Sequence, residues 1–444
     1  MKKVSSILKE VLEKIKPPEE DLNFIDSTLK KFLEDLRKRI KKNKIKAEIF
    51  IGGSFAKGTV ILKDYYDVDI FIRFDKKYKE LSKLTKKILR GIKNVSMIHG
   101  SRDYFRVKKG PNFFIELVPV KKISKPKEAE NITDLSYSHV NYIKKRVKNK
   151  RILDEIRIAK AFCYATNTYG AESYIRGFSG YAIELLVYYY GSFLKFIKAM
   201  TKDIKKSEKG RNMWSKEYEE KWEDMRKKIV IDIEKYYRTR QMVLFDINAS
   251  KLISPIILID PTYPQRNALA ALSRETFEKF QKACREFLKK PSLKAFDIEE
   301  VDLEKIKKQA KKKKLEFILI KAVTNKQKGD IAGSKLLKFF RHLGNQISRF
   351  FNIIHNGFSY DGKKSADYYF VVKSKKVILV PGPFIKDKNS VSAFRKKHKK
   401  TVIKGGRIYA RDKIGFSVKK FVSDWKKTYK DRLKEMSISE LEII

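Results

Sequence analysis

The chain has 444 residues, 42% of them hydrophobic and 35% charged, which is enough for several buried cores and excludes a single small domain. Its 103 Lys and Arg residues against 53 Asp and Glu give a formal net charge of +50 at pH 7, so a polyanion such as nucleic acid is the first partner to expect. The two cysteines and five scattered histidines exclude a disulfide framework and a Cys/His zinc site, and without any apolar run long enough to cross a bilayer we expect a cytoplasmic protein.

Two amphipathic helices open the chain, over Val4–Ile15 and Asp21–Lys42. We expect them to brace a small mixed sheet. Its predicted strands lie near 46–51, 67–74, 103–108 and 112–120, with a lysine-rich helix near 78–93. Residues 1–140 would therefore form a first domain of mixed α and β structure.

Two aspartates one residue apart, Asp67 and Asp69, follow a turn at Gly52-Gly53-Ser54. Residues two apart on a strand point to the same face, so both carboxylates can hold the same cations. Two Mg²⁺-type ions on carboxylate oxygens activate an attacking hydroxyl and neutralise a leaving pyrophosphate, while a glycine turn at a helix start suits a phosphate. An acidic pair can also be a solvated strand face. Because these acids interrupt an otherwise apolar strand, we favour the metal site.

A third acid, Glu116, interrupts the strand-like run 112–120. Beside the two aspartates it could be a metal ligand or the general base that takes the proton from an attacking 3′ hydroxyl. The alternative is a glutamate that faces solvent from an edge strand.

From about Ser136 the hydrophobic period becomes helical, which predicts a second, helical domain over 141–290 with one short strand at Pro255–Ile259. The highly charged stretch Lys202–Tyr237 is interpreted as a solvated helix pair, with an RNA-contacting surface as the less favoured alternative. Cys163 and Cys284 lie in partly apolar helical patterns and are expected in the core.

The hydrophobic pattern of the remaining residues predicts an α+β third domain over 291–382 and a basic tail over 383–444. We expect a strand at Leu315–Ile320, a long apolar helix at Ile331–Ile354, strands near 367–373, 376–380 and 407–411, a break at Pro381-Gly382-Pro383 and a final helix from Ser417. Basic runs such as Arg395–Lys400 are usually solvated, but several on one side would follow a phosphate backbone.

Several sequence blocks resemble the archaeal-type (class I) CCA-adding enzymes, tRNA nucleotidyltransferases of the polymerase β superfamily. The blocks are GGSFAKGT, YDVDIF, IELVPV, DLSYSHVNYI, YGAESYIRGFSGYAIELLVYYYGSFL, IDPTYPQRNALAALS and FQKACREFLKKPSL. The run Arg176–Tyr181 is the most discriminating of them. The resemblance implies an α+β fold with a polymerase β-like nucleotidyltransferase palm, a helical neck, and an α+β body and tail.

The resemblance also implies roles for individual residues. Asp67, Asp69 and Glu116 match the metal acids, although the family usually has Asp at the third position. The positions expected to contact the nucleotide are Ser54 and Lys57 at the triphosphate, His139 and Lys160 near phosphates, Tyr169 near the sugar, and Arg266 at the base edge. From the residues alone, Lys160 could equally be a solvent lysine and Arg266 an arginine at a helix start.

The implied reaction is template-independent addition of C, C and A to the 3′ end of tRNA from CTP and ATP, with two Mg²⁺ ions and release of pyrophosphate. The implied partner is the tRNA acceptor stem and T-arm, and a homodimer is expected from the resemblance. One alternative is another RNA 3′ nucleotidyltransferase, of the poly(A) or oligoadenylate type. A second is a catalytically weakened tRNA-binding homologue, which Glu116 would favour.

Overall fold

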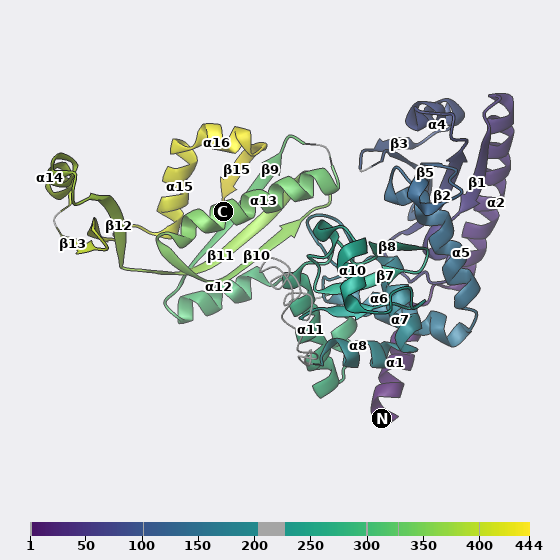
Figure 1. Cartoon of the computed structure of the whole chain (residues 1–444), viewed down its shortest axis with the longest axis horizontal. Helices are drawn as coiled ribbons and strands as arrows, with labels where there is room; N and C mark the ends of the chain where they lie inside the picture. The colour runs from purple at the N-terminus through teal and green to yellow at the C-terminus, as the bar shows by residue number, and fades with distance from the viewer. Residues whose placement is uncertain (1, 101, 203–226, 299–300, 327, 399) are drawn as a thin grey trace. The chain divides into compact units, whose positions relative to one another are not determined.

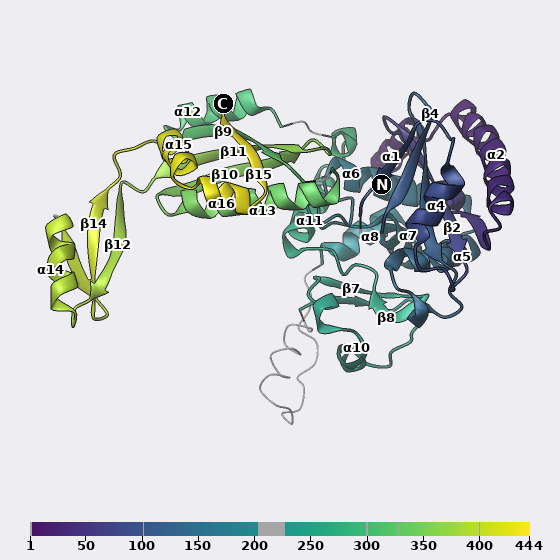
Figure 2. The same ribbon diagram turned by 90° about the horizontal axis from the view of Figure 1, so that it is seen from above.

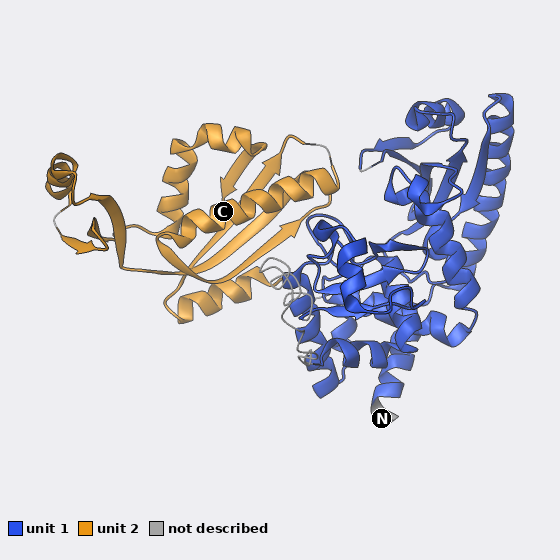
Figure 3. Cartoon of the chain, in the orientation of Figure 1, with its two compact units in different colours: residues 1–299 blue, residues 300–444 orange. Residues whose placement is uncertain are grey.

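A computed structural model describes residues 2–444 except 101, 203–226, 299–300, 327 and 399. Its helices and strands (Figure 1) divide into two compact units, residues 1–299 and residues 300–444 (Figure 3). Among the described helices, none is both long and apolar enough to cross a membrane.

A five-stranded sheet forms the first part of unit 1, in the order β1-β2-β5-β4-β3. The strands are β1 Ala47–Ile51, β2 Tyr66–Phe74, β3 Val95–Ile98, β4 Tyr104–Gly110 and β5 Phe113–Lys121. The central pair β2 and β5 is parallel, and the other pairs are antiparallel. This confirms the mixed sheet, to which β3 is an addition that the sequence pattern did not predict.

Helices α2 (Glu19–Lys42) and α4 (Leu81–Leu89) bury one face of this sheet (Figure 2). Val68, Ile70 and Ile115 lie in that core together with apolar side chains of both helices. Since side chains alternate along a strand, Asp67, Asp69 and Glu116 belong to the opposite face. The core therefore determines which face can carry chemistry.

Helix α1 (Lys2–Ile15) does not brace the sheet as expected. Its Leu8 packs instead in a second, helical core with Phe162 and Phe280. The helices around this core are α5 Ser136–Arg146, α6 Lys150–Ala165, α7 Gly180–Tyr190, α8 Phe193–Met200 and α11 Arg274–Lys289. Cys163 and Cys284 are buried and unbridged, as predicted. An amphipathic pattern indicates that a helix buries one face, but not which core receives it.

A small sheet interrupts the region that was expected to be helical up to residue 290. It consists of β6 Ile229–Ile231, β7 Ile256–Asp260 and β8 Tyr263–Asn267, with α10 Arg240–Asp246 nearby. Only β7 was predicted, because strands of three to five residues carry too short a pattern to be distinguished from helix. Most of the predicted helix pair Lys202–Tyr237 lies outside the described residues, and its last part contains β6.

Unit 2 is built on a four-stranded sheet in the order β10-β11-β9-β15. Its strands are β9 Glu316–Thr324, β10 Phe351–Tyr360, β11 Ser365–Ser374 and β15 Ile438–Ile443. Its helices are α12 Leu303–Lys312, α13 Asp330–Ser348, α15 Val418–Thr428 and α16 Lys430–Glu435. Leu336, Phe351, Tyr368 and Trp425 lie in one core between sheet and helices.

The predicted helix Ile331–Ile354 is too long, because α13 ends at Ser348 and Phe351 begins β10. Phe351 keeps its place in the core, but it does so as a strand residue opposite Ser374. Pairing with β11 has replaced the helical continuation that the local pattern favoured.

The segment 383–444 was expected to be one tail. Instead β15 returns to the body sheet beside β9, so only part of this segment lies outside the body. A separate three-stranded sheet begins before this segment with β12 Val377–Phe384 and continues, after α14 Lys388–Lys397, with β13 Thr401–Lys404 and β14 Arg407–Lys413. Pro381 and Pro383 do not break the chain but lie inside β12, an edge strand with a register shift there, where a missing N–H is tolerated. The division at residue 140 stays a prediction.

The short 3₁₀ turns join these elements. They are η1 Pro126–Glu128, η2 Ile132–Leu135, η3 Ala249–Lys251 and η4 Leu293–Phe296, and the five-residue helix α3, Gly53–Lys57, follows β1.

Candidate active site

The two aspartates of β2 lie side by side with the third predicted acid. In the parallel pairing of β2 with β5, Asp69 is opposite Glu116. Asp67 is half-buried one step further along the same face. Strand alternation and parallel pairing thus bring the three predicted carboxylates together from two segments nearly 50 residues apart.

The glycine turn lies directly against Asp69, one of the two acids of β2. The Gly52 N–H donates to the carbonyl oxygen of Asp69 at 2.8 Å. Gly53 has φ +64, and a Cβ placed there would lie 1.8 Å from Oδ2 of Asp69. Only glycine combines that backbone conformation with so close an approach. The turn therefore supports the Asp69 carboxylate from one side.

Glu116 is not the solvent-facing glutamate of the alternative interpretation. Its side chain is 14% exposed, and its Oε1 accepts from Nε and Nη2 of Arg106 on β4 at 2.9 and 2.5 Å. Burial raises the pKa of Glu116, and the Arg106 guanidinium opposes that rise. The third acid is consequently engaged by an arginine of the neighbouring strand.

The acids fit a divalent cation through two carboxylates. Burial, then the charges of Glu116 and Asp67, raise the pKa of Asp69 to about 7, so negative charge is concentrated here and a cation would relieve it. No three acidic, histidine or cysteine side chains of the described residues form a group that could hold a metal ion. Asp67 and Asp69 supply hard oxygen ligands of the kind that Mg²⁺ prefers. Glu116 could join them only by leaving Arg106.

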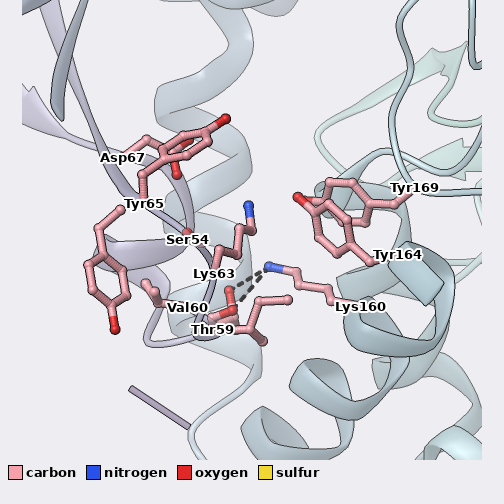
Figure 4. Close-up of a pocket in the computed structure, with 11 residues that line it drawn as sticks. Ser54, Thr59, Val60, Lys63, Tyr65, Asp67, Lys160, Tyr164 and Tyr169 are labelled. Atoms are coloured by element: carbon pink, nitrogen blue, oxygen red, sulfur yellow. Dashed lines mark hydrogen bonds between the residues drawn. The ribbon is translucent and has the colours of Figure 1, made fainter. Parts of the chain in front are cut away.

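A pocket lies beside Asp67, and it is lined by other residues for which the resemblance implied a contact with the nucleotide (Figure 4). Ser54, Lys160 and Tyr169 line it together with Asp67. Lys63 and Tyr164, which were not predicted, line it as well. The pocket thus joins the palm to helix α6 and to the turn that follows this helix.

Lys160 is a buried residue, 3% exposed, and not the solvent lysine of the alternative interpretation. Its Nζ donates to Thr59 Oγ1 and to Glu184 Oε1, each at 2.8 Å. Lys57, from the other predicted phosphate position, donates to Glu184 Oε2 at 2.6 Å. Both predicted phosphate lysines therefore meet at one carboxylate that sequence reasoning missed.

Two tyrosines form an aromatic wall of the pocket. The rings of Tyr164 and Tyr169 stack with centroids 3.9 Å apart and an interplanar angle of 18°. The ammonium of Lys63 lies 4.7 Å from the centre of the Tyr164 ring, which is cation–π distance. Tyr169 thus lies beside the pocket with its ring stacked on Tyr164, and its contact with a sugar stays a prediction.

The block Arg176–Tyr181 folds back on the turn that carries Tyr169. Phe178 N donates to Thr168 O at 2.8 Å, and Gly177 N donates to Gly170 O at 2.7 Å. These bonds tie the run Arg176–Tyr181 to the turn at Tyr169, so two parts of one sequence block contribute to the site.

His139 and Arg266 meet at a different carboxylate, Asp260. His139 Nε2 lies 3.0 Å from Asp260 Oδ2, and Arg266 Nη1 donates to the same oxygen at 2.6 Å. Tyr181 stacks on the His139 imidazole and donates its hydroxyl to Oδ1 of Asp260 at 3.0 Å. Arg266 lies in β8, not at a helix start. Burial lowers the pKa of His139 despite its contact with Asp260.

Sequence reasoning missed the buried acids that organise the predicted cations. Glu184 is a single charged residue within the apolar run of α7, and Asp260 ends the apolar run of β7. A lone acid in such a run indicates a buried partner, so a signal existed in both cases. For Arg106, Lys63 and Tyr164 the sequence offers no such signal.

Two family models match the chain in succession. Residues 29–154 match the nucleotidyltransferase domain, and residues 154–297 match the second domain of tRNA nucleotidyltransferases. The first of these confirms the predicted polymerase β-like palm, and the mixed helices and sheets confirm the α+β class.

The curated relatives of this chain are named CCA-adding enzymes. The chain is 38% identical to the CCA-adding enzyme of Nanoarchaeum equitans over 52% of this chain and 52% of that protein. It is 27% identical to the CCA-adding enzyme of Methanocaldococcus jannaschii over 92% of this chain and 87% of that protein. The chain thus matches about half the length of the first relative. A solved structure of a cytoplasmic RNA terminal U-transferase is 11% identical and aligns with 68% of this chain and 100% of that one, at a TM-score of 0.48.

The palm with its paired acids, the successive family matches and the curated relatives agree with one another. The chain therefore carries a nucleotidyltransferase domain followed by the second domain of tRNA nucleotidyltransferases, and it is similar to archaeal CCA-adding enzymes.

Proposed function

We propose that the protein adds C, C and A to the 3′ end of tRNA without a nucleic-acid template, using CTP and ATP and releasing pyrophosphate. The observation that carries the proposal is a pocket lined by Asp67, Lys160 and Tyr169, with Asp69 two residues further along the same face of β2. The relatives named CCA-adding enzymes supply the identity of the acceptor and of the nucleotides.

Each part of the site has a proposed role. Asp67 and Asp69 would hold two Mg²⁺ ions, whose chemistry is to favour ionisation of the 3′ hydroxyl and to neutralise the departing pyrophosphate. Ser54, Lys57 and Lys160 bind the triphosphate by hydrogen bonds and charge, and Tyr169 contacts the sugar. Glu116 serves as a third acid once it is released from Arg106.

His139 and Arg266 belong to the nucleotide side of the same proposal. Arg266 offers a planar fork that suits a base edge, and His139 would lie near a phosphate. Their shared contact with Asp260 supports a fixed orientation of both side chains.

The engagement of Glu116 by Arg106 favours a second candidate, a tRNA-binding homologue with weakened catalysis. A polymerase of the poly(A) type is a third. The three functions differ in their products, because CCA addition stops after three nucleotides whereas a poly(A) enzyme produces a long homopolymer.

The decisive experiment uses a tRNA that lacks its 3′ CCA, incubated with Mg²⁺ and CTP alone, ATP alone, or both, followed by sequencing of the ends. We expect two C residues with CTP alone and CCA with both nucleotides. Asp69→Ala is the matched inactive variant: its incorporation should fall at least about 10³-fold, since a metal ligand is removed, while its affinity for tRNA stays near that of the wild type.

Long A tails would refute CCA addition, and substantial incorporation by Asp69→Ala would refute the metal assignment. Absence of any product with Mg²⁺ or Mn²⁺ would favour the binding protein. A homodimer, expected from the resemblance, and a cytoplasmic location, expected from the sequence, belong to this proposal.

A further inference from the structure

Glu184 lies at the centre of a buried charge cluster that no proposed catalytic role explains. Its side chain is fully buried on α7, and both of its oxygens are used. Oε2 accepts from Lys57 at 2.6 Å, and Oε1 accepts from Lys160 at 2.8 Å and from the Thr59 hydroxyl at 2.9 Å. The cluster connects α3, the loop after it, α6 and α7.

We propose that Glu184 is a positioning residue for the nucleotide triphosphate, because its carboxylate holds the ammonium groups of Lys57 and Lys160 side by side. This inference rests on the proposed function, in which these two lysines contact phosphates. Each lysine occupies its own carboxylate oxygen, so their spacing is determined by one rigid group. Two lysines and one carboxylate leave a net positive charge beside the pocket, which suits a polyanion.

Without the carboxylate, two buried ammonium groups would repel each other. The side chains of Lys57 and Lys160 are only 9% and 4% exposed, so water screens them poorly. Burial lowers the pKa of Lys160 to about 8. The charges of Lys57 and Lys63 also lower this pKa, whereas the charge of Glu184 raises it. For Glu184 itself, burial acts to raise the pKa, but the Lys160 and Lys57 charges outweigh it and lower the pKa to about 2.

The sign of the expected pH effect follows from these contacts. When Glu184 is replaced by the neutral and nearly isosteric glutamine, the Lys160 pKa loses its raising influence and falls further. Lys160 then becomes neutral at a lower pH and binds phosphate less well as the pH rises. Each unit by which its pKa falls reduces the protonated fraction about tenfold at pH values above both pKa values.

The test measures the KM for CTP and kcat with tRNA lacking its CCA end, at pH 6.0 and pH 8.5, for the wild type and Glu184→Gln. The ratio of variant to wild-type KM removes the titration of the nucleotide itself. We expect this ratio to be several-fold larger at pH 8.5 than at pH 6.0, about sevenfold for a fall of one unit in the Lys160 pKa from about 8, with kcat changed much less. Glu184→Asp, which keeps the charge, should raise KM without the added pH dependence.

Asp134→Asn is the matched control, because Asp134 is also a fully buried carboxylate paired to a cation, Arg102, at 2.5 Å. It should lower stability without a pH-dependent KM. If Glu184→Gln does not fold, Thr59→Val removes the hydroxyl that joins Glu184 to Lys160, and it should raise KM more at pH 8.5 than at pH 6.0.

The inference is overturned if the KM ratio of Glu184→Gln is equal at both pH values, or if Asp134→Asn reproduces its pH dependence. The inference is also overturned if the KM of the Thr59→Val variant equals that of the wild type at both pH values. A wild-type protein that adds no C residues overturns the proposed function instead, so the two failures are distinguishable.

Discussion

At the scale of a single residue, Gly53 allows the glycine turn to lie against the Asp69 carboxylate, and no larger residue fits there. Its φ of +64 and the 1.8 Å that would separate an added Cβ from Asp69 Oδ2 are separate constraints. In Gly53→Ala the first should cost roughly 1–2 kcal/mol of unfolding free energy. The second should displace the Asp69 carboxylate, so nucleotide incorporation should fall by more than the loss of folded protein explains. Denaturant unfolding and incorporation assays measure the two effects.

Gly58 provides a matched control for this prediction. It has φ +65, and its added Cβ would meet only Leu153 Cδ1 at an ordinary 3.7 Å. Gly58→Ala should therefore show a similar loss of stability with incorporation nearly retained. Equal activity of the two variants would mean that the turn does not position Asp69.

Glu184 and Asp260 show what residue-level reading of the sequence can and cannot provide. The cations Lys57, Lys160 and Arg266, to which the resemblance assigns contacts with the nucleotide, are each paired to a buried acid. A list of residue types cannot reveal such pairing, since it depends on side chains that are remote in the sequence. A buried charge nevertheless requires a partner. A lone acid in an apolar run therefore predicts a buried ion pair, even where the sequence does not identify the partner.

At the scale of elements, the block Arg176–Tyr181 and the turn that carries Tyr169 form one unit. A Cβ at Gly177 would lie 2.1 Å from the carbonyl oxygen of Thr168, and backbone cannot yield as a flexible side chain can. Gly177→Ala should lower the unfolding free energy by about 1–3 kcal/mol and raise the KM for the nucleotide, because the turn must move. Denaturant titration and steady-state kinetics check the two parts.

Gly344 in α13 is the control for Gly177. The nearest atom to its added Cβ is Phe370 Cε1 at 3.5 Å, an ordinary contact. Gly344→Ala should be neutral or more stable by up to about 1 kcal/mol, since alanine is the better helix former. A neutral Gly177→Ala would show that the block does not hold the turn.

Elements with a strong local pattern were predictable, and those that depend on distant pairing were not. Strand β2, Tyr66–Phe74, agrees with the predicted 67–74 to within one residue, because alternation over so long a run is distinctive. Strand β15, which pairs with β9 more than 100 residues away, was missed, and Ile354 was assigned to a helix although it lies in β10. In the site, alternation placed Asp67 and Asp69 on one face, whereas Arg106 reaches Glu116 only through the pairing of β4 with β5.

At the scale of the whole molecule, the net charge of +50 is the property that bears most directly on binding of the proposed RNA partner. A polyanion that binds such a protein releases condensed counterions, so its affinity falls with salt along a straight log–log line. Helix α14 contributes Lys388, Arg395 and Lys396 to a shallow pocket together with Ile385. These side chains are exposed, and they are candidates for contacts with RNA phosphates.

Replacing Lys388, Arg395 and Lys396 together by glutamine should therefore weaken tRNA binding and make the salt slope shallower by about 1 for each phosphate contact that is lost. Binding is measured between 50 and 300 mM salt without nucleotide, and the affinity for CTP should not change. The control replaces Lys14, Lys30 and Lys83, three exposed lysines that are paired to nearby carboxylates, and removes the same formal charge. If both triple variants change the slope equally, the effect belongs to net charge and α14 is not a tRNA contact. If only the α14 variant changes it, the contact is local, because screening confines exposed charges to about 10 Å.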